Sequence, residues 1–179
     1  MFEIKVDDKA VMSSLDRLAA TAHNMSPVMR IVSQELARQT EKNFAAEGRP
    51  KWLGISRATL EGRVMARAKT RDGAIKKGAI RKDGRVSKSI GSRVGGQILQ
   101  DTGQLAASIT TSHDASSATV GSNKVYAAIH QLGGKTGHGH KVTMPARPFL
   151  PIDAQGQLQP EAEENILGLV NDYLSRIVG

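Results

Sequence analysis

The residues with the clearest potential for chemistry form the segment Gly134-Lys135-Thr136. It looks like the end of a phosphate-binding loop, in which the pattern GxxxxGK[ST] lets consecutive backbone N–H groups surround the phosphates of a nucleotide. The first glycine of that pattern would stand where the chain has Ile129, inside an expected helix. The pattern also needs a preceding strand, so we expect no nucleotide hydrolysis.

Three nearby histidines, His130, His138 and His140, are a second candidate for chemistry. Imidazoles two residues apart could share a metal ion if they lay on one strand. However, residues 133–144 contain no carboxylate, the chain has no cysteine, and ordering a glycine-flanked loop costs conformational entropy. We therefore expect no metal and no cofactor, and we interpret His138 and His140 as loop residues.

Other catalytic arrangements are missing from the sequence. It contains no GxSxG nucleophile turn, and its acidic residues stand at helix starts and ends, where capping explains them. We expect no catalytic residue and no enzyme activity. A hydrolase that uses His138 and His140 is the least favoured alternative.

The composition predicts a single domain over residues 1–179. Apolar residues make up 39% and charged residues 23% of the chain, as in ordinary globular proteins. The absence of cysteine excludes disulfide scaffolds and thiolate chemistry. Without a long apolar stretch or a signal peptide, we expect a soluble chain with no membrane partner.

The net charge of +8 is concentrated between Arg49 and Arg93, where 14 basic residues face 3 acidic ones. Within this stretch, residues 70–97 show no helical or strand periodicity and no repeat at a fixed period, which predicts a long flexible insertion. Two interpretations stay open: contact with DNA or an acidic protein, and a solvated loop. The candidate contact residues are Lys76, Lys77, Arg81, Lys82, Arg85, Lys88 and Arg93.

The first half of the chain is expected to be mainly helical. Alternation predicts a strand at residues 2–6, and apolar spacing predicts helices at 8–22 and from 26 to about 47. Ser26 is expected to cap the second helix, with Pro27 in its first turn. A shorter helix is expected from Ser56 to about Ala68, and Trp52 is expected to pack beside it.

The second half mixes strands and helices. The expected elements are a capped helical turn at 101–109, a hairpin of 109–112 with 118–121, and a helix at 125–132. Residues 133–144 read as a second flexible loop and 145–151 as an extended edge segment, since the latter is rich in proline. A final helix with one apolar face should begin at about Pro160.

Four short motifs in this half resemble those of a known family. They lie at residues 99–109, 120–122, 126–134 and 144–150. Their order and spacing over about residues 98–152 closely resemble the phage virion morphogenesis family, the tail-completion and head–tail joining proteins of Mu-like and related tailed phages. The first half adds a looser likeness in its paired helices and Trp52-Leu53.

The resemblance implies an α+β fold with a small antiparallel sheet, two long N-terminal helices and a C-terminal helix. It also implies a structural protein of the virion neck, assembled in the bacterial cytoplasm, that completes the tail or joins head to tail. Its implied partners are further copies in a ring, with sixfold symmetry as a guess, and the neighbouring neck, connector and tail tube proteins. Contact between the insertion and packaged DNA stays open.

The matched motifs imply roles for particular residues. Thr102 and Gly103 look like a helix cap and turn, Gly133 and Gly134 like backbone turns, and Tyr126, His130 and Gln131 like packed side chains with hydrogen-bond partners. The proline-rich segment would lie at an inter-subunit surface, with Phe149 as an anchor and Arg147 in a bidentate salt bridge. The family and assembly residues are Thr102, Gly103, Leu105, Tyr126, His130, Gln131, Gly133, Gly134, Pro145, Arg147, Pro148 and Phe149.

A basic DNA-binding protein that acts through residues 49–93 is the alternative to this assembly role. The concentration of positive charge favours it. The absence of a helix-turn-helix or zinc signature weakens it.

Overall fold

The computed structural model describes residues 9–87, 97–153 and 155–178. Its helices are α1 (Lys9–His23), α2 (Ser26–Ala46), α3 (Arg57–Ala68), α5 (Ala127–Leu132) and α6 (Pro160–Val178), with short 3₁₀ turns η1 (Ala106–Ser108) and η2 (His138–His140). Its strands are β1 (Ile109–His113), β2 (Ala118–Ser122), β3 (Gly134–Thr136) and β4 (Val142–Met144). The expected α+β class is confirmed. The strand expected at residues 2–6 lies outside the described residues.

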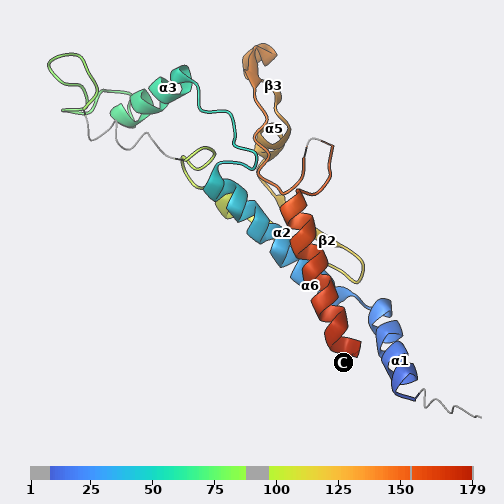
Figure 1. Cartoon of the computed structure of the whole chain (residues 1–179). Coiled ribbons are helices and arrows are strands. Elements are labelled where there is room, and N and C mark those ends of the chain that lie inside the picture. Colours follow the sequence, from blue (N-terminus) through green and yellow to red (C-terminus); the bar gives the residue numbers. More distant parts are fainter. Residues whose placement is uncertain (1–8, 88–96, 154, 179) are drawn as a thin grey trace, which may run out of the picture.

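Helices α2 and α6 run side by side in opposite directions, and α1 packs against α6 (Figure 1). Ion pairs join the end of α2 to the start of α6, since Glu161 meets Lys42 at 2.6 Å and Arg49 at 2.5 Å. The expected Ser26 cap is wrong. Met25 is the N-cap residue and makes no side-chain hydrogen bond, and the Asn24 carboxamide oxygen instead accepts from the Ser26 backbone N–H at 3.0 Å.

Helix α3 begins and ends close to where its apolar spacing predicted. Ser56 caps it, because its hydroxyl accepts the Thr59 backbone N–H at 3.2 Å. In Figure 1, α3 lies at the opposite end of the molecule from α1.

The strands form two antiparallel hairpins, each of two strands, in the described part of the chain. Strands β1 and β2 pair from Ile109 with Ser122 to His113 with Ala118 and lie against α2. Their connecting loop is closed by Asp114, whose carboxylate accepts hydrogen bonds from Ser117 and Ser116, and these bonds lower the pKa of Asp114 to about 2. This hairpin was correctly expected.

Residues 133–144, expected to be a flexible loop, instead form the second hairpin. Strand β3 pairs with β4 from Gly134 with Met144 to Thr136 with Val142, and η2 turns the chain between them. Four closely spaced glycines hid this hairpin, because glycine is depleted in strands and weakens the sequence signal for a strand.

The described part of the basic insertion is also more ordered than expected. Residues 69–87 form two successive turns, which we call the tandem turns, each closed by one antiparallel bridge: Lys69 with Ile75, and Ile80 with Val86. The two bridges are 11 residues apart, and equivalent bonds join Lys76 N–H to the Ala68 carbonyl and Ser87 N–H to the Ala79 carbonyl, both at 2.8 Å.

The expectation that no repeat occurs was therefore wrong. Each turn contains an Asp-Gly pair, and the glycines Gly73 and Gly84 have φ angles of +85° and +75°. Glycine adopts this left-handed conformation at little steric cost. Two copies are too few for an 11-residue period to stand out in the sequence alone.

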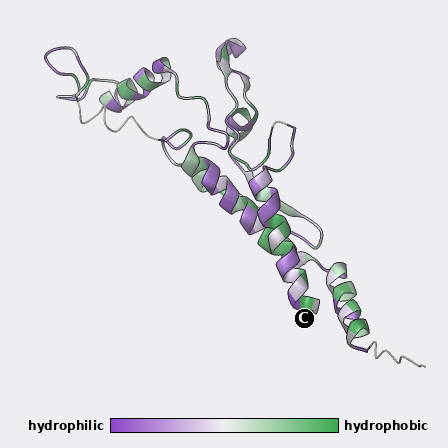
Figure 2. Ribbon diagram, in the orientation of Figure 1, coloured by the Kyte–Doolittle hydropathy of each residue, from purple (hydrophilic) through white to green (hydrophobic). Residues whose placement is uncertain are grey.

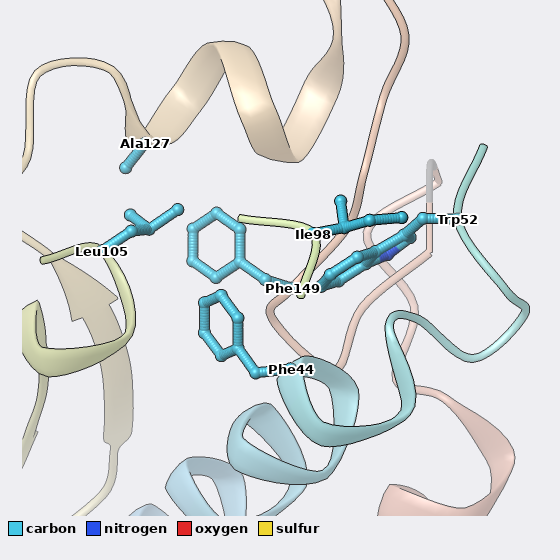
Figure 3. Close-up of a cluster of buried hydrophobic side chains, with 6 residues drawn as sticks. All are labelled: Phe44, Trp52, Ile98, Leu105, Ala127 and Phe149. Atoms are coloured by element: carbon cyan, nitrogen blue, oxygen red, sulfur yellow. The ribbon is translucent and has the colours of Figure 1, made fainter. Parts of the chain in front are cut away.

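The main apolar core lies where α2 ends. The cluster comprises Phe44, Trp52, Ile98, Leu105, Ala127 and Phe149, which we call the Phe149 cluster (Figure 3). The Phe149 ring stacks on Phe44 at 5.5 Å between centroids, and Trp52 meets Phe44 edge to face at 6.1 Å. The expected packing role of Trp52 is confirmed, but its described partners are residues of the Phe149 cluster and not helix α3.

Helix α1 carries apolar side chains that the protomer does not cover. Val11, Met12 and Leu15 are 58%, 50% and 52% exposed. Figure 2 shows hydrophobic residues along α1.

Candidate functional site

Residues from three of the four motifs come together around Phe149. Leu105, Ala127 and Phe149 are members of one cluster, although they come from three of the motifs (Figure 3). Burial of this kind removes apolar area from water and stabilises the fold. The main role of these motif residues is therefore to form the apolar core of the chain.

Polar side chains hold the proline-rich segment 145–151 in place. The Gln131 carboxamide oxygen accepts the backbone N–H groups of Phe149 and Leu150 at 2.9 and 3.0 Å. The Asn43 amide donates to the Phe149 carbonyl at 3.1 Å, and the Trp52 indole N–H donates to the Pro148 carbonyl at 3.0 Å. A buried backbone outside a helix or sheet has no regular partners for its N–H and C=O groups. These side chains supply the hydrogen bonds that a neighbouring strand would otherwise make. The expected hydrogen-bonded packing of Gln131 is confirmed.

Arg147 forms no salt bridge with the residues that the structure describes. Its Nε and Nη2 atoms donate to the Leu53 and Gly54 carbonyls, each at 3.1 Å. The residue is only 9% exposed, as the segment turns inward. Burial, together with the charge of Arg63, lowers the pKa of Arg147.

The expectation that this segment lies at an inter-subunit surface fits only its partly exposed members. Phe149 is 1% exposed and Arg147 is buried, so the protomer itself uses both side chains. Pro145 and Pro148 are half-buried. The sequence could not separate a buried apolar anchor from one that fills a partner's pocket.

Gly133 performs the backbone turn that its position suggested. It ends α5 with a φ of +70°, and a Cβ atom there would lie 2.6 Å from the Ala146 nitrogen. Both the conformation and the close approach exclude a larger residue. Gly134 follows with a φ of +130° as β3 begins.

Tyr126 and His130 meet edge to face at 6.0 Å between ring centroids. The expected hydrogen-bond partner is not found at one atom of the His130 ring, because the buried Nδ1 atom has no partner in the described part of the chain. Burial and, next, the charge of Arg147 lower the pKa of His130.

The motif at 101–109 is a turn rather than a capped helix. Leu105, not Thr102, is the N-cap residue of η1, and the Thr102 hydroxyl accepts the Gln104 backbone N–H at 3.5 Å. Gly103 has a φ of +71° in this turn, and Leu105 is buried in the Phe149 cluster. The expected turn is confirmed and the expected cap is wrong.

The described basic candidates all point to solvent from the tandem turns. They are Lys76, Lys77, Arg81, Lys82 and Arg85. Lys76 also donates from Nζ to the Arg67 carbonyl at 2.9 Å, which fixes one side chain near α3. Lys88 and Arg93 lie outside the described residues. This arrangement can attract a polyanion but contains nothing that selects a sequence.

Sequence reasoning missed the polar network between α2 and α6. Arg49 donates to the Asn43 oxygen at 2.8 Å and to the Gln39 oxygen at 2.7 Å, while it pairs with Glu161. Gln39 and Asn43 are fully buried. The signal was present as a polar stripe at every fourth residue through Glu35, Gln39 and Asn43, which an amphipathic pattern assigns to solvent.

The residues first considered for nucleotide or metal binding belong to ordinary secondary structure. Gly134-Lys135-Thr136 is strand β3, and His138 and His140 are exposed on η2. Among the described residues, no three histidine or acidic side chains gather around a possible metal position. In the same part of the chain, no helix combines the length and apolar character needed to cross a bilayer.

Comparison with known families identifies the family of this chain. The model of the phage virion morphogenesis family matches it twice, over residues 6–97 and 57–175. The chain belongs to the phage virion morphogenesis family. The matches extend the likeness from the four motifs to nearly the whole chain, and the family's role is structural, in building the virion.

Two relatives agree with this assignment. The Mu-like prophage FluMu G protein 2 of Haemophilus influenzae is 36% identical over 180 residues, which cover 99% of both chains. A proposed capsid assembly protein G of Escherichia phage Mu is 45% identical over 65 residues, covering 36% of this chain and 42% of the relative. No solved structure matches this chain.

Proposed function

We propose that this family member is a non-enzymatic subunit of the virion neck, where it forms a ring that completes the tail or joins head to tail. Its family membership supports a role in virion construction. The ring, its position in the virion and its neighbouring proteins are our proposal. The bacterial cytoplasm would be the place of assembly.

The observation that carries the proposal is a pair of uncovered apolar surfaces on different parts of the protomer. One is the α1 face with Val11, Met12 and Leu15, and the other flanks α5, where Val125 is 98% and Leu132 is 70% exposed. Figure 1 places α1 and α5 far apart along the molecule. Two unlike patches on one subunit suit head-to-tail contacts, which close into a ring when the rotation allows.

Electron microscopy of particles from a phage deleted for this gene tests the proposal. We expect filled heads separated from tails, or tails of abnormal length with ragged ends. Normal joined virions would overturn the proposed role.

A complementation series tests the α1 surface. Leu15→Glu should fail to restore joined virions, because a charge in a covered apolar contact loses its hydration. Ser13→Glu is the matched control, since Ser13 is exposed on the same helix but lies away from the apolar stripe. Equal restoration by both variants would exclude α1 as a contact.

DNA binding by the tandem turns is the second candidate function. The observation that favours it is the exposure of five basic side chains on two adjacent turns. Replacing all five with glutamine should reduce the slope of log affinity against log salt for duplex DNA by roughly 0.9 per lost phosphate contact. Weak binding with an unchanged slope would reject this candidate.

A further inference from the structure

A groove beside the Phe149 cluster contains chemistry that the proposed function does not use. It encloses about 300 Å³ and is lined by the chain after Trp52, helices α3 and α5, strand β4 and residues 98–99. A second hollow of about 210 Å³ continues it toward Thr102 and Tyr126. Arg63, Leu99 and His130 line both hollows, so the two form one continuous surface.

Two buried nitrogen atoms in this groove have no hydrogen-bond partner among the described residues. They are Nη1 of Arg63 and Nδ1 of His130. Buried polar atoms are nearly always paired, because leaving one unpaired costs free energy. Both unpaired atoms belong to side chains that line the same groove, which points to a missing acceptor there.

The groove also has an excess of positive charge. Burial and Arg63 lower the pKa of Arg147, and burial and Arg147 lower the pKa of His130. The acidic residue in the lining is Asp101, and it already pairs with Arg67 and, at 3.7 Å, with the Nε atom of Arg63. The acidic side chains of the described residues therefore neutralise the guanidinium charge in the groove only in part, and an incoming anion would be attracted to the remainder.

The other walls of the groove are apolar. Leu53 and Val142 stand at its rim with 68% and 56% exposure, and Leu99, Met144 and Pro145 line it further in. A free phosphate has no apolar groups to cover these walls, and the nucleic-acid backbone offers only the C–H groups of its sugars. A glutamate or aspartate flanked by apolar residues fits both the charge and the walls.

We propose that this groove binds an acidic side chain, flanked by apolar residues, from a neighbouring protein of the assembling virion. The carboxylate accepts hydrogen bonds from Arg63 Nη1 and, in the tautomer with a proton on Nδ1, from His130. The flanking residues cover Leu53 and Val142. This inference rests on the proposed assembly function and names the chemistry of one contact within it.

Peptide titration of the full-length protein, observed through the His130 imidazole signals in NMR, tests the groove directly. The probe is the peptide acetyl-Leu-Glu-Leu-amide, with acetyl-Leu-Gln-Leu-amide and inorganic phosphate as comparisons. We expect the glutamate peptide to bind saturably and to raise the pKa of His130. The glutamine peptide should bind at least tenfold more weakly, since a charge-assisted hydrogen bond is lost.

Variants show which side chain is responsible. Arg63→Met should weaken glutamate-peptide binding at least tenfold. Arg57→Met is the matched control, because Arg57 lies on the same helix, is highly exposed and pairs with Glu61 outside the groove. Val142→Glu provides a second block from an exposed position, so the test does not depend on the folding of Arg63→Met.

The outcomes of these experiments distinguish a failure of the groove proposal from a failure of the proposed function. Equal binding of the glutamine peptide or of phosphate, or no binding at all, would overturn the groove proposal. In phage complementation, Arg63→Met and Val142→Glu should fail where Arg57→Met succeeds. If the deletion blocks joining but both groove variants restore it, the groove proposal fails alone. If the deletion has no effect, the proposed function fails.

Discussion

The Phe149 cluster and the tandem turns use opposite kinds of contact. In the cluster, hydrogen bonds join residues about 100 positions apart, as from Asn43 to Phe149 and from Trp52 to Pro148. In the tandem turns, backbone bonds close over at most eight residues, as from Lys76 to Ala68. The cluster buries large aromatic rings, whereas the described turns bury only small side chains such as Ala79.

This difference separates stability from recognition. Long-range apolar packing removes large side chains from water and stabilises the fold, and close packing leaves little freedom for change. Local turns contribute little to global stability, so their exposed charges can serve a partner without affecting the core. The groove at Arg63 lies between these regions and combines an apolar wall with positive charge.

The strongest test of the comparison is Phe149→Ala. Removing a fully buried ring should reduce the free energy of unfolding by about 3–5 kcal/mol, since a cavity remains beside Phe44 and Trp52. Urea unfolding followed by circular dichroism measures the change. Val125→Ala, at a residue that is 98% exposed, should change it by no more than about 0.5 kcal/mol. Similar losses in both variants would show that the cluster is not the centre of stability.

Gln131→Leu tests the polar support of the cluster. The leucine has a similar volume but leaves the backbone N–H groups of Phe149 and Leu150 without their acceptor. We expect a loss of about 2 kcal/mol in the free energy of unfolding. Faster amide hydrogen exchange at residues 149 and 150 should accompany it. Unchanged exchange there would mean that another acceptor replaces the side chain.

Glycine substitutions compare local with helical backbone. Gly84→Ala should destabilise its turn by about 1 kcal/mol, because its φ of +75° is unfavourable for alanine. Gly62→Ala should stabilise the exposed α3 helix by about 0.8 kcal/mol, since a Cβ there meets no other atom within 4 Å. Local hydrogen exchange measures both effects. A loss of global stability in Gly84→Ala would contradict the independence of the turns.

The smallest expected effect is a pH dependence from His130. Its pKa lies below 6.5 in the folded chain, so the unfolded chain binds the extra proton first. Stability should therefore fall as the pH decreases from about 7 through 6.5, and level off below the folded pKa. Urea unfolding across this range in the wild type and in His130→Gln isolates the effect. A wild-type dependence that the variant retains would assign it elsewhere.

The periodicity of apolar residues was sufficient to predict the long helices and the first hairpin from the sequence. The apolar spacing of α1 and the start of α6 at Pro160 were readable because one face of each follows a helical repeat. The second hairpin and the tandem turns were missed, because glycine and charge dominate both segments. The groove was also unpredictable, since Arg63, His130 and Met144 are far apart in the sequence and meet only in the fold.

The sequence by itself determined the α+β class, the family and the concentration of positive charge, because residue order, motif spacing and composition carry all three. The tertiary structure decided which motif residues are buried and which groups lack a partner. Arg147 shows the reason: as a sequence letter it suggests a surface salt bridge, yet the chain folds it against the Leu53 and Gly54 carbonyls. Burial and hydrogen bonding depend on neighbours that only long-range packing brings together.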